Sequence, residues 1–582
     1  GPVTLRFDDD TVHALVGGQA GAGKSTLLLD VVYGLAARYG PDQLRFHLLD
    51  FKEGLEFAQF APRGDDPFVL PHADTIGMDS DREFGVAVLR HVRALMQRRA
   101  LAMRAVGARD LRGLRAAQVG TGWPRIMIVI DEFQVMLTPL DAVSREAVSH
   151  LEVLARQGRA YGIHLLLASQ TLSGIDALDA TAGKRGSIFG QFALRIALRT
   201  SISESRVLLS TTNEAAGALA GVGEAIVNRR NGHPAGNELV RVAYPEPALL
   251  ATLRASLSSA NVSRTNVSRA AGNRPPKVFV GHAPALLDDN PLFRSLAGTP
   301  APLDRGGPDR DGLDPGHQDP GHHDDGEVAE PLALVGVPLD LHPAAVGVRL
   351  SPLPGRNLAV LGPLRREAVG VLHAAVTSLA AQAGPDGLGV DIVAVTGEMA
   401  PVADILAERV RAFGQAAEVH PPAALRRVLA QTSDAVRARE ESALAVETGP
   451  QHGPAQPLRL LVLFAADAGR GVLEAKDPVS RRSGLDDLRF VTRRGPVQRV
   501  HLLGWWRGPG RLLDDLGPTH RDDVGAWIAV GVPGNDLFSL AGNRSVTAVT
   551  SANRAVLFDR NGQAEARTII PFAPLQRRVD AR

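Results

Sequence analysis

Eight consecutive residues near the start of the chain have the spacing of a phosphate-binding loop: Gly18-Gln19-Ala20-Gly21-Ala22-Gly23-Lys24-Ser25. Glycines let such a loop wrap a polyphosphate with its backbone N–H groups and with the N-terminus of the helix that follows. We expect Lys24 to reach the β- and γ-phosphates and the Ser25 hydroxyl to ligate Mg²⁺. With Thr26, these residues form the predicted site for ATP and Mg²⁺.

Two adjacent acids, Asp131 and Glu132, come directly after an apolar run at 126–130. A buried strand would deliver both carboxylates to the phosphate site. We expect Asp131 to hold Mg²⁺ through water and Glu132 to polarise the water that attacks ATP. The pattern alone is common and also suits a helix cap at a strand end. Because it follows a phosphate loop in the same chain, the catalytic interpretation is favoured.

A third strand-like run, at 163–168, ends in Ser169-Gln170. If this strand lies beside the one that carries Asp131, the Gln170 amide reaches the γ-phosphate and can sense it. The alternative is a strand-end amide that caps a neighbouring loop.

A sheet has to bring these groups together. Apolar runs without polar alternation are typical of strands buried on both faces of a parallel sheet. They occur at 44–49, 126–130, 164–168, 195–198 and 224–227, with helical stretches such as 86–103 and 143–161 between them. Residues 3–250 are therefore predicted to form one α/β domain.

The second half of the chain, 331–582, repeats the first. The segments at 40–49, 125–130, 163–166 and 230–232 parallel those at 384–393, 459–464, 500–503 and 560–562. Residues 251–330 between the copies are predicted to be a linker, with a disordered stretch rich in Pro, Gly, Asp and His.

The second copy lacks the residues that carry the chemistry in the first. By alignment from Gly18 and Gly362, the phosphate lysine and the magnesium hydroxyl become Ala368 and Val369, with Glu367 before them. The other replacements are Ala465-Ala466 for the acid pair, Gly495-Pro496 for Gly158-Arg159, and Arg507 for Gln170. We expect this copy neither to hydrolyse nor to bind ATP, and to serve a structural or regulatory role.

Bulk composition excludes several other classes of protein. The net charge of +1 neither requires nor excludes a nucleic-acid partner, and the absence of cysteine excludes disulfides and thiolate metal sites. No apolar run is long enough to span a membrane. We expect a cytoplasmic location. Gly1-Pro2 resembles the remnant of a protease cleavage, so we expect a piece of a longer protein whose omitted part can include a membrane anchor.

The motifs, taken in order, resemble the FtsK/SpoIIIE branch of the FtsK–HerA motor ATPases. The residues that carry this resemblance are the phosphate loop, Asp50-Phe51-Lys52-Glu53-Gly54, Asp131-Glu132-Phe133, the segments 158–164 and 168–170, and 195–199. The branch contains DNA translocases and the EccC ATPases of type VII secretion. The resemblance implies two tandem RecA-like P-loop domains (mainly parallel sheets flanked by helices, the second degenerate), hexameric rings, and ATP held at subunit interfaces.

The same resemblance implies roles for further residues. Arg159 aligns with the arginine finger that reaches a neighbouring subunit's γ-phosphate. A helix-end salt bridge is the alternative for Arg159, since Arg156 or Arg195 could supply the finger. Asp50 and Lys52 are expected to support the site. Lys184-Arg185 lie where DNA-translocating relatives have a pore loop, and an ordinary solvated loop is the alternative there.

The predicted function is a hexameric, ATP-driven translocase or processing enzyme for double-stranded DNA, with catalysis in the first domain. The alternative is an EccC-like protein-secretion ATPase, in which a protein partner docks on the second domain. A second alternative is a scaffold that binds ATP with little turnover; the intact Glu132 counts against it.

Overall fold

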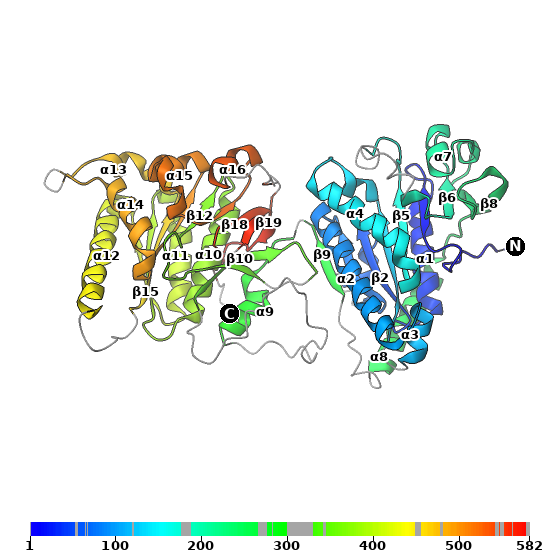
Figure 1. Ribbon diagram of the computed structural model, residues 1–582, viewed down its shortest axis with the longest axis horizontal. Coiled ribbons are helices and arrows are strands. Elements are labelled where there is room, and N and C mark those ends of the chain that lie inside the picture. Colours follow the sequence, from blue (N-terminus) through cyan, green and yellow to red (C-terminus); the bar gives the residue numbers. More distant parts are fainter. Residues whose placement is uncertain are drawn as a thin grey trace. The chain divides into compact units, whose positions relative to one another are not determined.

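Two compact units, Gly1–Gly281 and His282–Arg582, make up the computed structural model of the chain (Figure 1). The structure describes residues 2–52, 56–63, 66, 68–118, 122–175, 188–265, 276–281, 283–298, 330–341, 345–447, 456–477, 481–541, 546, 552–561 and 563–577. Within this described part, none of the helices combines the length and apolarity needed to cross a bilayer.

Unit 1 is built on a nine-stranded sheet in the order β8-β7-β6-β1-β5-β4-β2-β3-β9. The strands are β1 Ala14–Gly17, β2 Leu44–Asp50, β3 Ala73–Met78, β4 Arg125–Asp131, β5 Ile163–Ser169, β6 Leu194–Leu198, β7 Glu224–Asn228, β8 Asn237–Arg241 and β9 Lys277–Val280. All neighbouring pairs are parallel except β6–β7 and β7–β8. Each apolar run chosen from the sequence forms a strand, so the predicted parallel-dominant sheet is confirmed.

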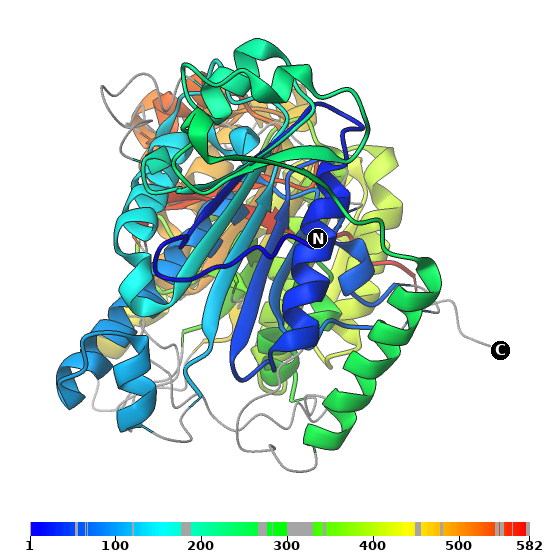
Figure 2. The same cartoon turned by 90° about the vertical axis from the view of Figure 1, so that its right-hand side faces the viewer.

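Helices cover both faces of this sheet. They are α1 Lys24–Arg38, α2 Arg82–Val106, α3 Leu111–Ala117, α4 Ala142–Gln157, α7 Ile202–Leu208 and α8 Pro247–Thr265. Figure 2 shows α1 (dark blue) and α8 (green) in front of one face, where α1 buries Leu28 and Val32 against the strands. On the other face α4 contacts β5 and α2 packs along α4. The helix expected over 143–161 ends at Gln157 and continues as the 3-10 turn Gly158–Tyr161, which Gly162 closes at φ 68°.

Part of the segment expected to be a linker is folded into unit 1. Helix α8 runs to Thr265, and β9 pairs in parallel with β3 at the edge of the sheet. An edge strand leaves one row of backbone hydrogen-bonding groups available, and β9 uses that row on β3. The boundary between the units falls at residue 281.

Unit 2 has a ten-stranded sheet in the order β11-β10-β19-β18-β17-β12-β16-β15-β13-β14. The strands are β10 Leu332–Pro338, β11 Val346–Arg349, β12 Leu358–Leu361, β13 Leu388–Ala394, β14 Ala416–His420, β15 Leu458–Phe464, β16 Val500–Trp506, β17 Ala526–Ala529, β18 Ala555–Asp559 and β19 Gln563–Pro571. The run from β17 to β14 has the order and direction that unit 1 shows from β6 to β3. The two halves are therefore copies of one fold, as the repeated segments predict.

The unit 2 sheet is also covered on both faces. The helices are α9 Pro291–Leu296, α10 Arg365–Gln382, α11 Ala400–Arg411, α12 Leu425–Glu447, α13 Arg470–Glu474, α14 Gly484–Arg494, α15 Pro509–Leu516 and α16 Gly534–Ala541. Helices α10 and α11 share one buried apolar cluster with the strands, and α12, α14, α15 and α16 share a second one.

Candidate active site

The phosphate loop of unit 1 connects β1 to α1 and has the backbone that its glycines predict. Gly21 and Gly23 lie at φ 73° and 104°, in the left-handed region that strains any side chain. Gly23 precedes α1 without a capping side chain among the described residues, and the first turn of α1 carries no acid. The helix N-terminus thus keeps N–H groups and positive potential for an anion.

The sheet brings the predicted catalytic groups other than Arg159 together at the carboxyl ends of its parallel strands. The parallel strands β1, β5, β4 and β2 are neighbours, so their carboxyl ends lie together. Those ends carry the phosphate loop, Gln170, Asp131-Glu132 and Asp50, in that order. Asp50 stands directly beside Asp131 in the register of β2 with β4.

Lys24 and the two acids form a buried ionic cluster. The Lys24 ammonium donates to Asp131 Oδ1 at 2.5 Å and also to Glu132 Oε1. All three residues are less than 10% exposed. Burial raises the pKa of Asp131, against the opposing charge and hydrogen bond of Lys24. A phosphate that binds Lys24 would therefore take over contacts that these carboxylates make.

Glu132 has the geometry and ionisation of a fixed base. Its backbone lies at φ 52°, and its Oε2 accepts hydrogen bonds from Gln134 Nε2 at 2.6 Å and from the Gln170 N–H at 3.3 Å. Burial alone would raise the pKa of Glu132, but the hydrogen bonds from Gln134 and Lys24 outweigh it and hold the pKa below its ordinary value. The carboxylate stays charged at neutral pH and can polarise a water molecule.

Sequence reasoning missed Glu56, which also reaches the phosphate loop. The Ser25 hydroxyl donates to Glu56 Oε1 at 2.5 Å. Glu56 follows β2 beyond the Asp50-Phe51-Lys52 segment, in a turn without a motif of its own. Only the contact with a residue of α1 identifies it.

The donor set fits Mg²⁺ and a polyphosphate. Asp131 and Glu132 bind the Lys24 ammonium, Asp50 stands beside Asp131, and Glu56 accepts the Ser25 hydroxyl. A divalent ion would reduce the repulsion between these carboxylates and a polyphosphate. Hydroxyl and carboxylate oxygens are the protein ligands that Mg²⁺ prefers. Ser25 and Asp131 would hold the ion, and Mg²⁺ would supply charge neutralisation of the phosphates when bound.

Arg159 lies at the amino end of β5, whereas Lys24 follows the carboxyl end of the neighbouring strand β1. Arg159 precedes β5, whose seven residues span about 23 Å, whereas the phosphate groups meet the other end of that strand. Its side chain is 60% exposed, with Asp9 Oδ1 at 3.6 Å. Arg159 therefore does not reach the phosphate loop of its own chain, and its role as an arginine finger stays a prediction.

The two alternatives to Arg159 differ in exposure. Arg195 is buried and donates to the backbone carbonyls of Phe189, Phe192, Leu208 and Leu209, so it is a structural residue. Arg156 is exposed on α4, and its guanidinium Nη1 lies 3.7 Å from Glu152 Oε1. Lys184 and Arg185, the expected DNA contacts, lie outside the described residues.

Strand register corrects the alignment of the acid pair in unit 2. Asp131 stands beside Asp50 in unit 1, and the matching pair in unit 2 is Phe464 beside Ala394. Glu132 and Ala465 share the left-handed backbone that follows each strand. The acid pair is thus replaced by Phe464-Ala465, one position earlier than the sequence suggested, because apolar runs give no register by themselves. Neither replacement carries a carboxylate.

The loop before α10 is half as long as the predicted phosphate loop of unit 1. Three residues, 362–364, separate β12 from α10, whereas six separate β1 from α1. Glu367, which precedes Ala368 in the sequence alignment, is buried and accepts the backbone N–H of Asn553. Arg507 donates to Asp467 Oδ2 at 2.9 Å. The remaining polar groups of this edge therefore bind one another.

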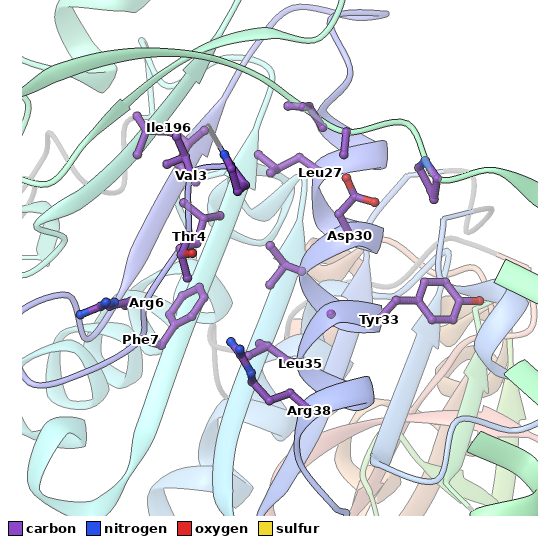
Figure 3. A pocket seen from close by; sticks show the side chains of 18 of the residues that line it. Val3, Thr4, Arg6, Phe7, Leu27, Asp30, Tyr33, Leu35, Arg38 and Ile196 are labelled. Atoms are coloured by element: carbon purple, nitrogen blue, oxygen red, sulfur yellow. The ribbon is translucent and has the colours of Figure 1, made fainter. Parts of the chain in front are cut away.

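Unit 1 also has a groove of about 1510 Å³, whose lining does not include the phosphate loop. Figure 3 shows it between residues 3–7 and α1, with Leu27, Asp30, Leu35 and Arg38 along the helix side. Burial raises the pKa of Asp30 to about 6.

Comparisons with known proteins relate the chain to one family of ATPases. The FtsK/SpoIIIE family model matches residues 2–174. EccC5 of the ESX-5 secretion system of Mycobacterium tuberculosis (strain CDC 1551 / Oshkosh) is 32% identical over 174 residues, 28% of this chain and 12% of the relative. EccC4 of the ESX-4 system of M. tuberculosis (strain H37Rv) is 28% identical over 406 residues, 63% of this chain and 29% of the relative. The DNA translocase FtsK of Helicobacter pylori (strain 26695) is 28% identical over 261 residues, 42% and 27% of the two chains.

Two solved structures share the fold over nearly the whole chain. The cytoplasmic domain of the type VII secretion ATPase EccC from Thermomonospora curvata has a TM-score of 0.61 at 21% identity, covering 97% of this chain and 60% of that one. ATPases 2 and 3 of the same protein, in complex with a signal sequence peptide, give 0.55 at 16% identity, covering 98% and 90%. The chain spans only 12 to 29% of the length of the curated relatives named above. Residues 2–174 thus form a domain of the FtsK/SpoIIIE family, in a chain with the fold of tandem EccC ATPase domains.

Proposed function

We propose that this chain is the ATP-hydrolysing part of an EccC-like protein-secretion ATPase, with hydrolysis in unit 1 alone. The extent of the alignment with EccC4 carries this proposal. It covers 63% of the 582 residues, whereas unit 1 holds only residues 1–281, so it has to include part of unit 2. The alignment with FtsK covers 261 residues and is short enough for one unit.

In this proposal the carboxyl edge of unit 1 binds ATP and Mg²⁺. Lys24 binds the phosphates, Ser25 and Asp131 hold the ion, and Glu132 polarises the attacking water. Gln170, which donates its backbone N–H to Glu132, would sense the γ-phosphate. Arg159 completes the site of a neighbouring copy in a ring, which we take to be a hexamer.

Unit 2 would serve as a docking and regulatory domain without turnover. Its edge has lost the acid pair, the lysine and the hydroxyl, and its remaining charges are paired internally. A protein partner that docks there could change the activity of unit 1 through the chain. The presence of a signal peptide in one structure of the same fold motivates a peptide as the first partner to test.

A double-stranded DNA translocase is the second candidate, favoured by the similarity to FtsK. One experiment separates the two functions. The steady-state ATPase rate of the full chain is measured alone, with a signal-sequence peptide, and with a 50-bp duplex. We expect the peptide to raise the rate and the duplex to leave it unchanged. Stimulation by the duplex alone, decreasing with salt, would instead establish the translocase function. ATP binding with negligible turnover under every condition would support the scaffold.

A further inference from the structure

The turn after β2 is tied to the edge of the sheet by Asp50. This side chain is buried at the end of the strand, and its carboxylate accepts the backbone N–H of Lys52 at 2.8 Å and that of Glu56. The Asp50 carbonyl accepts the N–H of Ser80 at 2.9 Å. Asp50 thus fixes the backbone on both sides of the undescribed residues 53–55 and sets the position of Glu56.

Glu56 in turn determines how the Ser25 hydroxyl is oriented. A hydroxyl has one hydrogen to donate and two lone pairs to offer. Ser25 donates its hydrogen to Glu56 Oε1, so the lone pairs of Oγ are left for a cation. A carboxylate acceptor also increases the electron density on Oγ, as carboxylates do for other metal ligands to which they hydrogen-bond.

The two acids at the end of β4, Asp131 and Glu132, accept hydrogen bonds from groups other than the Ser25 hydroxyl. Asp131 Oδ1 accepts from Lys24 and from the N–H of Glu132 at 2.9 Å, and Glu132 accepts from Lys24, Gln134 and Gln170. Among the described groups at this edge, Glu56 is the carboxylate to which the Ser25 hydroxyl is bonded.

The second copy has neither an acid at the position of Asp50 nor a hydroxyl at the position of Ser25. The position of Asp50 in the strand register is taken by Ala394, and the second residue of α10, which is the counterpart of Ser25 in α1, is Arg366. If Asp50 only stabilised the end of its strand, its loss would not be expected to accompany the loss of the Ser25 hydroxyl. The joint loss is expected if Asp50 and Ser25 serve the same ion.

We propose that Glu56 is a positioning residue that orients the Ser25 hydroxyl toward Mg²⁺, and that Asp50 holds Glu56 in place. This rests on the proposed binding of Mg²⁺ and ATP by unit 1. Partners that orient metal ligands typically account for a 10- to 100-fold effect on metal affinity. The inference gives a role to the Asp-Phe-Lys segment, which the catalytic groups leave unexplained.

The test measures the binding of a fluorescent ATP analogue to the full chain, in EDTA and over a series of Mg²⁺ concentrations. We expect Glu56→Ala to raise the half-saturating Mg²⁺ concentration roughly tenfold or more. Affinity in EDTA should stay the same or improve, because one negative charge is removed. Glu56→Gln should lie between Glu56→Ala and the wild type, since its amide oxygen still accepts a hydrogen bond. Asp66→Asn, which removes a surface charge paired with Arg254, is the matched control.

A double-mutant cycle with Ser25→Ala tests whether Glu56 acts through the hydroxyl. We expect Glu56→Ala to have little further effect on the Mg²⁺ requirement once the hydroxyl is gone. The inference is overturned if Glu56→Ala and Glu56→Gln keep the wild-type Mg²⁺ requirement within twofold, or if the effects of Glu56→Ala and Ser25→Ala simply add. Failure of the wild type to bind the analogue at any Mg²⁺ concentration would instead overturn the proposed function.

Discussion

Replacing Glu132 with glutamine should separate ATP binding from hydrolysis. The substitution keeps the size of the side chain and removes a carboxylate that is fixed by Gln134, Gln170 and Lys24. Because the pKa of Glu132 is held below its ordinary value, the wild-type group is an anion at neutral pH. A positioned base contributes about 10²- to 10⁴-fold to a rate. We therefore expect kcat to fall by that factor, which is about 3–5 kcal/mol in the barrier.

The same substitution should strengthen nucleotide binding. Lys24 is shared between Asp131 and Glu132, and two unit charges 4 Å apart interact by about 4 kcal/mol at an effective dielectric constant of 20. Part of this attraction becomes available to the phosphates when Glu132 is neutral. A gain of about 1.4 kcal/mol corresponds to a tenfold lower Kd for Mg–ATP.

Phosphate release gives kcat, and titration with a fluorescent ATP analogue gives Kd. Glu214→Gln is the matched control, because Glu214 pairs with Arg206 on the surface. A Glu132→Gln protein that binds ATP and still turns over within tenfold of the wild type would refute the assignment of Glu132 as the base. A loss of binding would refute the argument about Lys24.

Three other predictions concern the ring, the second unit and the groove. Mixing Arg159→Ala with Glu132→Gln chains should restore ATPase activity above that of either alone, because mixed rings contain sites with both groups intact; absence of restoration argues against a finger in trans. Calorimetry should give one ATP per wild-type chain and none for Lys24→Ala, and residual stoichiometric binding would show that unit 2 has a site. Asp30→Asn should increase the free energy of unfolding of unit 1 at pH 7 by about 1 kcal/mol after allowance for solvent screening. This corresponds to a rise of about 2 °C in its thermal midpoint. Burial raises the pKa of Asp30 to about 6, so ionisation of the wild-type carboxyl destabilises the folded state fully above pH 6. The stabilisation by Asp30→Asn should therefore disappear by about pH 4. An equal stabilisation at pH 4 and pH 7 would contradict this prediction.

Local patterns predicted the elements well where burial dictates residue type. Strands buried on both faces need continuous apolar runs, and each predicted run in unit 1 became a strand, from Leu44–Asp50 to Glu224–Asn228. The pattern does not specify strand direction, so it could not show that β7 and β8 run antiparallel. It also did not predict β9, a strand of only four residues at the sheet edge that β3 stabilises through backbone hydrogen bonds.

The sequence by itself determined the type of chemistry. Lys24, Ser25, Asp131 and Glu132 are recognisable because a phosphate loop and an acid pair need fixed residue types at fixed local spacing. The loss of these residues in the second copy is equally visible, since each replacement removes a charge or a hydroxyl.

Tertiary structure alone decided which groups meet. Glu56 lies 31 positions from Ser25 and belongs to no pattern, yet in the folded chain the segment after β2 places its carboxylate on the Ser25 hydroxyl. The parallel pairing of β1 with β5 separates Arg159, which precedes β5, from Lys24, which follows β1. Strand register shows that Phe464, not Ala465, stands where Asp131 does. Local sequence encodes what each segment can do, but contacts between distant segments depend on how the sheet is assembled.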